Sequence, residues 1–589
     1  MINLRRIRTY LLSLGVIITF AGLVLLLLES RPYQHQTNAE TGKDFSHDSA
    51  LGLDSINHSL AVPRSHSRPV TEEVVQKGVT PSIDTIRLDS TWTYGHGVGH
   101  NALNINQMGT TVYLPGIQSS HRISSESKQE IHTTFIYIFN PHEQAQTFTI
   151  RFFNNSGTSV RQVSYNIRPF QTLSLNTHHP DINLTNFQGS AIIQTGSDSP
   201  HKLMVSYDKV KVFEDSTDPS RSWSKACGLE GLSAQMASNI NYLSPVTFQK
   251  WGASNHYITV MNTSNTEDTD ITLEFCFTEG GNCTTPLLYN LSPHGSTTID
   301  IYGERVQAHL QDNSGYEPGH TGMVVIRSSK LTSKIVSISE DSGVNGMYGS
   351  NGDWGRARST IDHGSDAICL MNITKAQWGI WNTGFGYSNV SPTNRGNFSA
   401  SATYYNTDGS VAQTEWFNRG QAYGSFSGMF WWIGSNEEKP FHGTVVVRKT
   451  SGSGSLVGGT QDLADYDTWR RYEPFGRGTT AIPCSEGKMG STVYLTGLVD
   501  FARQKPTSFS VFNPNSQPIT VQAYLYDRNG TLTRKISPGN TSPYSTFIHL
   551  IEEGDFGNGV GSVLIKAWKS GDETIPAPIV AVSHSHTLR

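Results

Sequence analysis

Apolar and polar residues alternate in short runs along the chain from about residue 92 onward. Two examples are FTIRFFNNSG (148–157) and ITVQAYLYDRNG (519–530), which both end in turn-forming Asn and Gly residues. A period of two, interrupted by turn residues about every 8–12 positions, is typical of antiparallel strands with one buried face. The pattern therefore predicts an all-β fold, with virtually no helix after residue 30.

The strands belong to a repeated unit. Met108–Gly116 (MGTTVYLPG) returns as Met489–Gly497 (MGSTVYLTG), with seven of nine residues identical and an offset of 381 residues, which is three times 127. Weaker copies occur at the two intermediate places, 239–246 and 367–374. The later strands follow in the same order, and one of them opens on a glycine in every unit: Gly189, Gly322, Gly443 and Gly561. Four copies of one unit are therefore predicted.

Each unit holds about seven predicted strands, which is the strand number and size of an immunoglobulin-like antiparallel β-sandwich. A β-propeller is the structural alternative, but its blades of about 40–50 residues are much shorter than this unit. The predicted sandwiches cover residues 92–224, 225–358, 359–478 and 479–589, and the third is rich in aromatic residues. We expect them to follow one another as a rod.

The first 30 residues differ from the rest of the chain. Arg5, Arg6 and Arg8 precede an uncharged apolar run at 11–28. Such a run rises about 27 Å as a helix, close to the hydrocarbon thickness of a bilayer. We therefore expect a signal-anchor transmembrane helix within residues 1–30, with the arginines in the cytoplasm and the bulk of the chain outside the cell. A cleaved signal peptide is the alternative, although the run is long for one and no small-x-small site follows it directly.

Residues 31–91 are rich in Ser, His, Asn, Thr and Pro, and they contain few aromatic residues. A segment of this composition cannot bury enough apolar surface to offset the entropy that ordering would cost. It is predicted to be a flexible polar tether between the membrane and the first sandwich.

This layout resembles bacterial cell-surface proteins that carry tandem immunoglobulin-like β-sandwich repeats behind a single membrane segment. The resemblance covers roughly residues 92–589 and rests on the repeat architecture and on the recurring order of YLP, FNP and Gly-small-apolar segments. It implies a structural or adhesive role at the cell surface. No functional residue carries over from it.

Composition narrows the class of partner. Charged residues make up 16% of the chain, and the net charge of −5 is spread without long runs of one sign. Nucleic-acid binding needs a basic surface, which this chain does not provide. The expected partners are the membrane, through residues 11–28, and a glycan or a surface protein. Self-assembly is left open.

The five cysteines contain no CxxC spacing that would indicate a zinc site. Cys276 and Cys283 flank a predicted hairpin turn and can face each other across adjacent strands, so we predict a disulfide between them, with two free thiols as the alternative. In the strand ITLEFCF the apolar set includes Phe275 and Phe277, which places Cys276 on the opposite, solvent face. Three cysteines are left over, so at least one is expected to be buried and unpaired or to pair between chains.

Common catalytic and cofactor motifs are missing: the sequence has no GxSxG, HExxH, Walker A loop or dinucleotide fingerprint. The 21 histidines are scattered, and even His96 and His100, four residues apart, flank a glycine-rich stretch that is unsuited to a helix. We read them as surface or turn residues rather than metal ligands. The sequence therefore predicts a protein that is not an enzyme and holds no cofactor or metal. Calcium binding by acidic linker segments such as DSGVNG (341–346) and DLADYD (462–467) is left open, since Ca²⁺ prefers carboxylate and carbonyl oxygens.

The third unit gains aromatic residues that its sister units lack. Trp431 and Trp432 are adjacent, so on a strand one of them must face outward. Aromatic faces stack on sugar rings and anchor protein contacts, although most aromatics of this unit are better explained as core. We predict that the outward member of this pair marks a contact surface of a membrane-anchored structural or adhesive protein. The alternative is a carbohydrate-binding protein, or a cell-wall-associated hydrolase with its site in the third unit.

Overall fold

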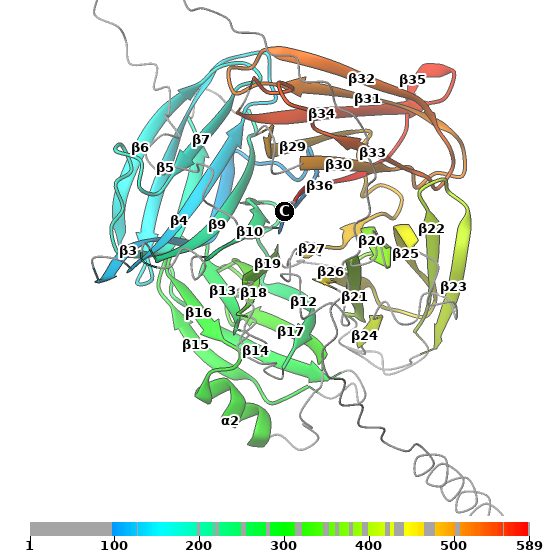
Figure 1. Cartoon of the computed structure of the whole chain (residues 1–589). Coiled ribbons are helices and arrows are strands. Elements are labelled where there is room, and N and C mark those ends of the chain that lie inside the picture. The colour runs from blue at the N-terminus through cyan, green and yellow to red at the C-terminus, as the bar shows by residue number, and fades with distance from the viewer. Residues whose placement is uncertain are drawn as a thin grey trace, which may run out of the picture. The chain divides into compact units, whose positions relative to one another are not determined.

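A computed structural model describes most of the chain from Gly97 onward. The described residues are 97–125, 128–196, 201–215, 217, 223–248, 255–277, 283–312, 321–344, 353–359, 364–375, 381–390, 398–418, 425–428, 441–464, 478–500, 507–557 and 559–586. All of them belong to one compact unit of the chain. They form antiparallel strands almost throughout, so the predicted all-β fold is confirmed (Figure 1).

Most strands fall into four successive groups of seven, with one extra strand in the last. The first group is β3 (Thr111–Ser125), β4 (Lys128–Phe139), β5 (Gln146–Asn154), β6 (Ser159–Ile167), β7 (Thr172–Asn176), β8 (Phe187–Thr195) and β9 (Met204–Asp215). The second is β12 (Ile240–Thr247), β13 (Asn255–Asn262), β14 (Thr269–Phe277), β15 (Leu287–Leu291), β16 (Ser296–Asp300), β17 (Thr321–Ser328) and β18 (Ile335–Val344).

The third group is β20 (Ala367–Lys375), β21 (Trp381–Asn389), β22 (Ser399–Asn406), β23 (Val411–Asn418), β24 (Ser425–Gly428), β25 (Phe441–Ser451) and β26 (Leu456–Ala464). The fourth is β29 (Thr492–Val499), β30 (Thr507–Phe512), β31 (Ile519–Tyr526), β32 (Leu532–Thr541), β33 (Thr546–Leu550), β34 (Val560–Lys569), β35 (Asp572–Pro576) and β36 (Val580–His586). The helix described in the structure, α2 (Glu304–Asp312), lies between β16 and β17.

Within each group the strands pair in one order. The first strand pairs with the sixth, the sixth with the third and the third with the fourth, while the second lies between the fifth and the last. In the first group the far end of β3 also pairs with β4. An immunoglobulin domain differs in placing its last strand beside its sixth. The antiparallel sandwich expected from the sequence is therefore present, but its strand order is not that of an immunoglobulin domain. Strand length and alternation do not specify which strands become neighbours.

Each group encloses its own apolar core, built from strands of both of its sheets. Ile150 and Ile136 represent the two sheets in the first core, and Leu273 and Ile258 do so in the second. These side chains are fully buried, since alternate residues of every strand point inward. We refer to the four groups as the first to fourth sandwich.

The strand-opening glycines occupy equivalent places in the four sandwiches. Gly189, Gly322, Gly443 and Gly561 each pair with the first strand of their sandwich next to an irregularity in its register. A Cβ atom on the first three would lie about 2 Å from a carbonyl oxygen of the neighbouring strand, as with Gly189 and Phe153 O at 2.0 Å. The repeated glycine therefore reflects a repeated close approach of backbones.

Short strands in the linkers complete the sandwich that precedes them. In the first linker, β10 (Trp223–Glu230) pairs with β9 and β11 (Leu232–Ser233) pairs with β3. In the second, β19 (Asp353–Ser359) pairs with β18. In the third, β27 (Gly478–Thr480) pairs with β26 and β28 (Ile482–Pro483) with β20.

In the fourth sandwich, strands from the start of the described chain take the place that linker strands occupy in the other three. Strand β1 (Gly97–Asn101) pairs with β36, and β2 (Leu103–Asn104) pairs with β29. The contacts between sandwiches therefore run in a closed circuit from first to fourth and back to the first. The rod expected from tandem repeats would have left both end sandwiches with an open side, and this pairing replaces it.

The membrane segment predicted at 11–28 and the tether predicted at 31–91 lie outside the described residues. Among the residues that are described, no helix has the length and apolar character needed to cross a bilayer.

Candidate functional site: the meeting of the linker strands

Strand β1 and the linker strands β10, β19 and β27, which we together call the four linker strands, meet through hydrogen bonds between residues at corresponding places. Figure 1 shows β10, β19 and β27 gathered near β36, the strand with which β1 pairs, and contacts join β1, β10, β19 and β27 to one another. The residues concerned are Asn101, Glu230, Ser359 and Thr480, one from each linker strand. We call these four residues the linker circuit.

The linker circuit is closed. The Asn101 backbone N–H donates to Glu230 Oε1, and Ser359 Oγ donates to Glu230 Oε2 at 3.2 Å. Thr480 Oγ1 donates to the Ser359 carbonyl oxygen at 2.7 Å, and Asn101 Nδ2 donates to the Thr480 carbonyl oxygen at 3.1 Å. These four bonds pair most of the buried polar groups of the circuit, but the side-chain oxygen Oδ1 of Asn101 is buried without a hydrogen-bond partner in the described part of the chain.

Charged side chains surround one side of this circuit. His100 Nε2 lies 3.0 Å from Asp208 Oδ1, and Tyr137 donates its hydroxyl to Asp208 Oδ2 at 3.1 Å. His100 is 3% exposed and Glu230 5%, so solvent hardly reaches either group. The closing strand β1 is therefore held to the first sandwich, through Asp208, and to the first linker, through Glu230.

Burial and charge act together on these groups. Burial alone would lower the pKa of His100, but the carboxylates of Asp208 and Glu230 outweigh it and raise that pKa. Burial also raises the pKa of Glu230 against the opposing effect of His100. Burial, with Asp208 beside it, raises the pKa of Tyr137 well above its usual value.

A histidine between two carboxylates can in principle transfer protons, but such chemistry needs access for a substrate. This cluster is buried among strands of the first and fourth sandwiches and the linkers, so its geometry suits a structural role. In the described part of the chain, no three His, Cys, Asp or Glu side chains are grouped so that they could hold a metal ion.

We use the word joint for the contact between consecutive sandwiches. An aromatic pair recurs in three of the four joints. The pairs are Phe153 with His294, Tyr405 with Tyr544, and Tyr526 with Phe170, with ring centroids 4.5, 4.7 and 4.7 Å apart. The second member of each pair follows a proline and has a positive φ of 53–57°. The same turn therefore presents an aromatic ring to the preceding sandwich.

A glycine turn docks beside each of these aromatic pairs. A Cβ atom on Gly157, Gly409 or Gly530 would lie 2.0–2.3 Å from the carbonyl oxygen of a proline in the next sandwich. All three glycines have φ between 81 and 90°, a conformation that side chains disfavour. Only a residue without a Cβ atom fits both the turn and the approach.

Polar groups strengthen particular joints. Lys209 of the first sandwich forms an ion pair with Glu340 of the second, and both are largely buried. Between the third and fourth sandwiches, Thr444 and Thr546 share a hydrogen bond of 3.0 Å. Thr172 and Ser562 do the same between the first and fourth at 2.7 Å.

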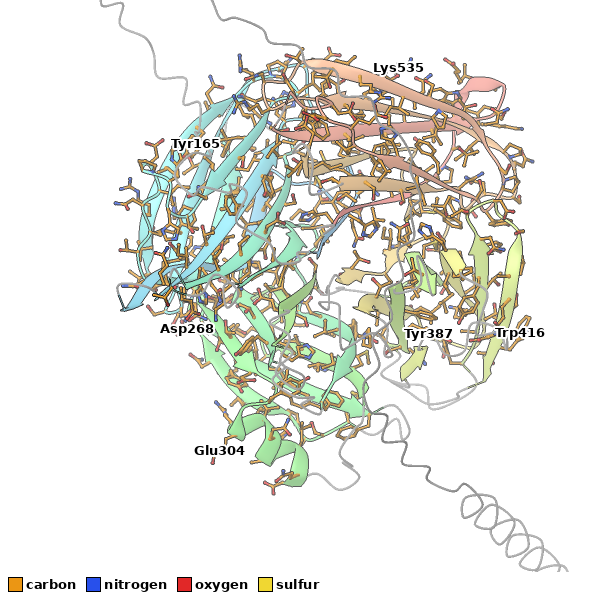
Figure 2. The ribbon with its side chains drawn as sticks, in the orientation of Figure 1. Tyr165, Asp268, Glu304, Tyr387, Trp416 and Lys535 are labelled. Carbon is orange, nitrogen blue, oxygen red and sulfur yellow. A yellow bond between two sulfur atoms is a disulfide. The ribbon has the colours of Figure 1, made fainter. Side chains whose placement is uncertain are left out.

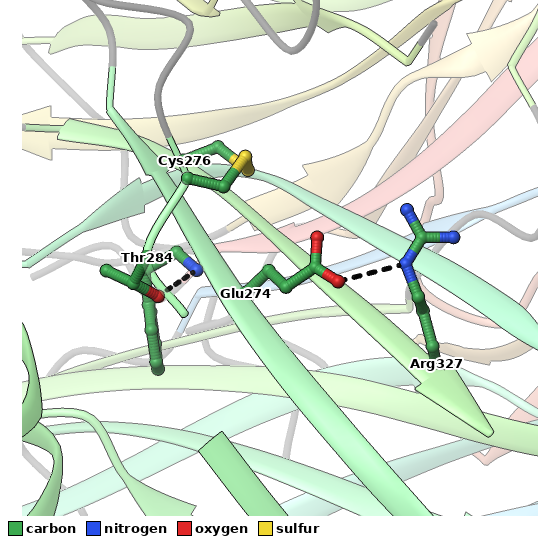
Figure 3. Close-up of a disulfide and its surroundings, with 6 residues drawn as sticks. Glu274, Cys276, Thr284 and Arg327 are labelled. Atoms are coloured by element: carbon green, nitrogen blue, oxygen red, sulfur yellow. Dashed lines mark hydrogen bonds and ion pairs between the residues drawn. A yellow bond between two sulfur atoms is a disulfide. The ribbon is translucent and has the colours of Figure 1, made fainter. Parts of the chain in front are cut away.

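Two disulfides are present, and one of them joins a linker to a sandwich. Cys276 and Cys283 are bonded across the end of β14, as drawn in Figure 3 beside the Glu274–Arg327 ion pair. Cys369 of β20 is bonded to Cys484, which follows β28. The second bond was not predicted, because 115 residues separate the two cysteines. Cys227 is buried and belongs to neither bond.

The predicted solvent exposure of Cys276 is wrong. It does point away from Phe275 and the core of its own sandwich, but it is fully buried. Val390 and Val457 of the third sandwich cover it. Sequence alternation shows only that a residue faces away from its own core, and here a neighbouring sandwich occupies that side.

The predicted contact residues Trp431 and Trp432 lie outside the described residues. Another tryptophan of the third sandwich is described: Trp416 lies on β23, which is the end strand of its sheet. Its side chain is 69% exposed, and Figure 2 shows it at the outer side of that strand. Tyr387, by contrast, is buried within the sandwich.

End strands without protection are prone to pair with other chains. The corresponding end strand of the fourth sandwich, β32, carries Arg534, Lys535 and Pro538, which discourage such pairing. Strand β23 has the sequence VAQTEWFN and contains no lysine, arginine or proline. It also exposes Val411, so this strand carries two large exposed apolar side chains.

Sequence reasoning missed the linker circuit. The prediction that His100 is a surface or turn residue is wrong, because His100 lies in strand β1 and is 3% exposed. The sequence predicted no role for Asn101, Glu230, Ser359 or Thr480. Their spacing is the signal that could have indicated them. Asn101 and Glu230 are 129 residues apart, and so are Glu230 and Ser359. Four unlike residues at one repeat position do not look alike in a sequence.

Comparisons with known proteins add no family. No family model matches the chain, and no curated protein matches it. Among solved structures, a chain of the T13 IBDV viral particle is similar to this chain with a TM-score of 0.11 and 9% identity, covering 59% of this chain and 70% of that one. A likeness this slight carries no argument about fold or function.

Proposed function

We propose that this chain is a membrane-anchored surface protein that acts by contact, as a structural or adhesive element outside the cell. The observation that carries the proposal is the exposed Trp416 on the unprotected end strand β23. Exposed tryptophan is costly on a free surface and is enriched at the centre of protein contacts and against sugar rings.

Two further observations support an extracellular setting. The two disulfides are typical of compartments that keep thiols oxidised. The apolar run at 11–28, preceded by three arginines, is typical of a segment that enters the export pathway and stays in the membrane.

The buried charges support contact rather than catalysis. His100, Asp208 and Glu230 tie strands together and are shielded from solvent, so they hold the joints. A binder built from several sandwiches needs such joints, because fixed domains present a contact surface with less loss of entropy.

The contact surface is tested by Trp416→Ala, with Leu331→Ala as the matched control. Leu331 is 86% exposed on a turn of the second sandwich, so its loss also removes exposed apolar surface. We expect Trp416→Ala to weaken attachment of the full chain to surfaces or glycans about tenfold or more, with thermal unfolding unchanged. Unchanged attachment would remove Trp416 from the proposal, and Trp431→Ala/Trp432→Ala would then be measured in the same way.

A glycan array distinguishes the two kinds of partner. Binding to defined glycans that is lost in Trp416→Ala favours a carbohydrate ligand, whereas attachment without glycan binding favours a protein. The anchor is tested separately, by a carbonate wash of membranes and by sequencing the mature N-terminus. A mature protein that begins between residues 29 and 45 would contradict the anchor.

A further inference from the structure

The joint between the fourth and first sandwiches differs from the other three in its chain connection. Seven residues connect β9 to β10, eight connect β18 to β19, and thirteen connect β26 to β27. Strand β1 precedes β36 in the chain and the other strands of all four sandwiches lie between them, so no short linker leads from β36 into β1. We call this joint the seam.

Residues 97–104 close the seam, and we call them the strap. Its strand β1 pairs with β36 from Gly97 opposite His586 to Asn101 opposite Val582. The backbone N–H of Ala102 then donates to the Ala581 carbonyl oxygen at 2.9 Å, and Ala102 belongs to the core of the fourth sandwich. The strap is therefore an integral part of a sandwich to which no short linker ties it.

The joints differ in the kind of reinforcement that they carry. The Cys369–Cys484 disulfide fixes the third linker to the third sandwich. The Cys276–Cys283 disulfide lies within the second sandwich and packs against Val390 and Val457 of the third. Lys209 and Glu340 form an ion pair across the joint of the first and second sandwiches. Across the seam, His100 of the strap forms an ion pair with Asp208 of the first sandwich, whereas the described residues of the two sandwiches share no disulfide and no Lys or Arg ion pair.

We propose that the strap is a releasable closure and that the circuit opens at the seam before any other joint. A strand that leaves its partner returns faster when a short linker keeps it nearby, because loop closure costs less entropy for short loops. The linker strands β10, β19 and β27 have such connections to their partner strands, and β1 does not. Opening would uncover the aromatic contact between Phe170 and Tyr526.

Hydrogen exchange of the full chain in detergent tests the proposal, with the sister ladders as internal controls. Amides in the β1–β36 ladder should exchange about tenfold faster than those in the β10–β9, β19–β18 and β27–β26 ladders. Equal or slower exchange in the β1–β36 ladder would overturn the proposal.

A disulfide across the strap provides the second measurement. Val98 and Ser585 are paired residues, so Val98→Cys/Ser585→Cys in a Cys227→Ala background can bond when β1 is in place. Oxidation should slow exchange in this ladder to the level of the others, and reduction should restore the fast rate. Failure of the two cysteines to bond would show that β1 does not occupy this place, and a bond that leaves exchange unchanged would also overturn the proposal.

Discussion

The side-chain amide of Asn101 donates a hydrogen bond to the carbonyl oxygen of Thr480 over 3.1 Å, although 379 residues separate them in the chain. Both residues sit on linker strands, and through Glu230 and Ser359 the same bonding continues to the other two linkers. The centre of the molecule is thus polar, whereas each sandwich has an apolar core. Such a centre stabilises most when its polar groups are paired.

Removal of His100 should destabilise the protein strongly. At pH 6, below the ordinary histidine pKa of about 6.5, His100→Ala leaves Asp208 buried without its cationic partner, which costs about 3 kcal/mol in the free energy of unfolding. His201→Ala is the control, since His201 is only partly buried and should change stability by about 0.5 kcal/mol or less. Urea unfolding of both variants measures the difference, and equal midpoints would contradict the assigned role of His100.

Stability should fall as the pH rises through neutrality. The pKa values of His100 and Glu230 are both raised in the folded protein, so the folded state binds more protons than the unfolded state. The contribution of His100 is fully present below its unfolded pKa of about 6.5 and is lost as the pH passes its higher folded value. Urea unfolding at several pH values between 6 and 9 should show this decline, and His100→Gln should reduce it. Identical slopes would contradict the prediction.

A glycine in the docking turn should be less replaceable than one in a free turn. Gly530 and Gly539 belong to the same sandwich and have nearly equal φ values of 87 and 86°. A Cβ atom on Gly530 would lie 2.2 Å from Pro169 O, whereas nothing lies within 4 Å of one on Gly539. Gly539→Ala should therefore cost about 1 kcal/mol of conformational strain, and Gly530→Ala at least about 1 kcal/mol more. Thermal unfolding of the pair gives the comparison, and equal losses would mean that the turn is not held at the seam.

The two disulfides should differ in their effect on stability. The Cys369–Cys484 bond closes a loop of 115 residues, and the Cys276–Cys283 bond closes one of 7. In the chain-entropy model, the disulfide that closes the longer loop stabilises the folded protein by about 2 kcal/mol more than the other disulfide. Cys369→Ala/Cys484→Ala should therefore lower the free energy of unfolding more than Cys276→Ala/Cys283→Ala, as measured in urea without reductant. A larger loss from the short loop would show that packing against Val390 and Val457 dominates there.

The sequence was informative about strands and about repetition, because both are local patterns. The alternation in 148–157 and 519–530 corresponds to β5 and β31, and the repeated glycines such as Gly189 mark equivalent strand starts. Pairing between distant segments is different, since it depends on what neighbouring sandwiches contribute. The closing role of 97–104, the burial of Cys276 and the Cys369–Cys484 bond all arise from such contacts.

The candidate site was predictable only in part. Adjacent tryptophans suggested a contact surface in the third sandwich, and the structure describes a different exposed tryptophan there, Trp416. A tryptophan on a strand of alternating residues can face either side, and the sequence around Trp416 does not indicate which. The linker circuit was invisible for another reason, because Asn101, Glu230, Ser359 and Thr480 share a place in the fold without sharing a side-chain type.

Because β1 pairs with β36, β1 cannot form this pairing during synthesis until β36 has been made. Strand β1 leaves the ribosome among the first folded elements, whereas β36 follows some 490 residues later. At about 5–20 residues per second this delay is roughly 25 to 100 s. Throughout that interval the earliest strand of the nascent chain has no partner, while the first three sandwiches receive theirs within a few residues of their last strand. Residues 97–104 therefore depend on completion of the fourth sandwich for their strand pairing.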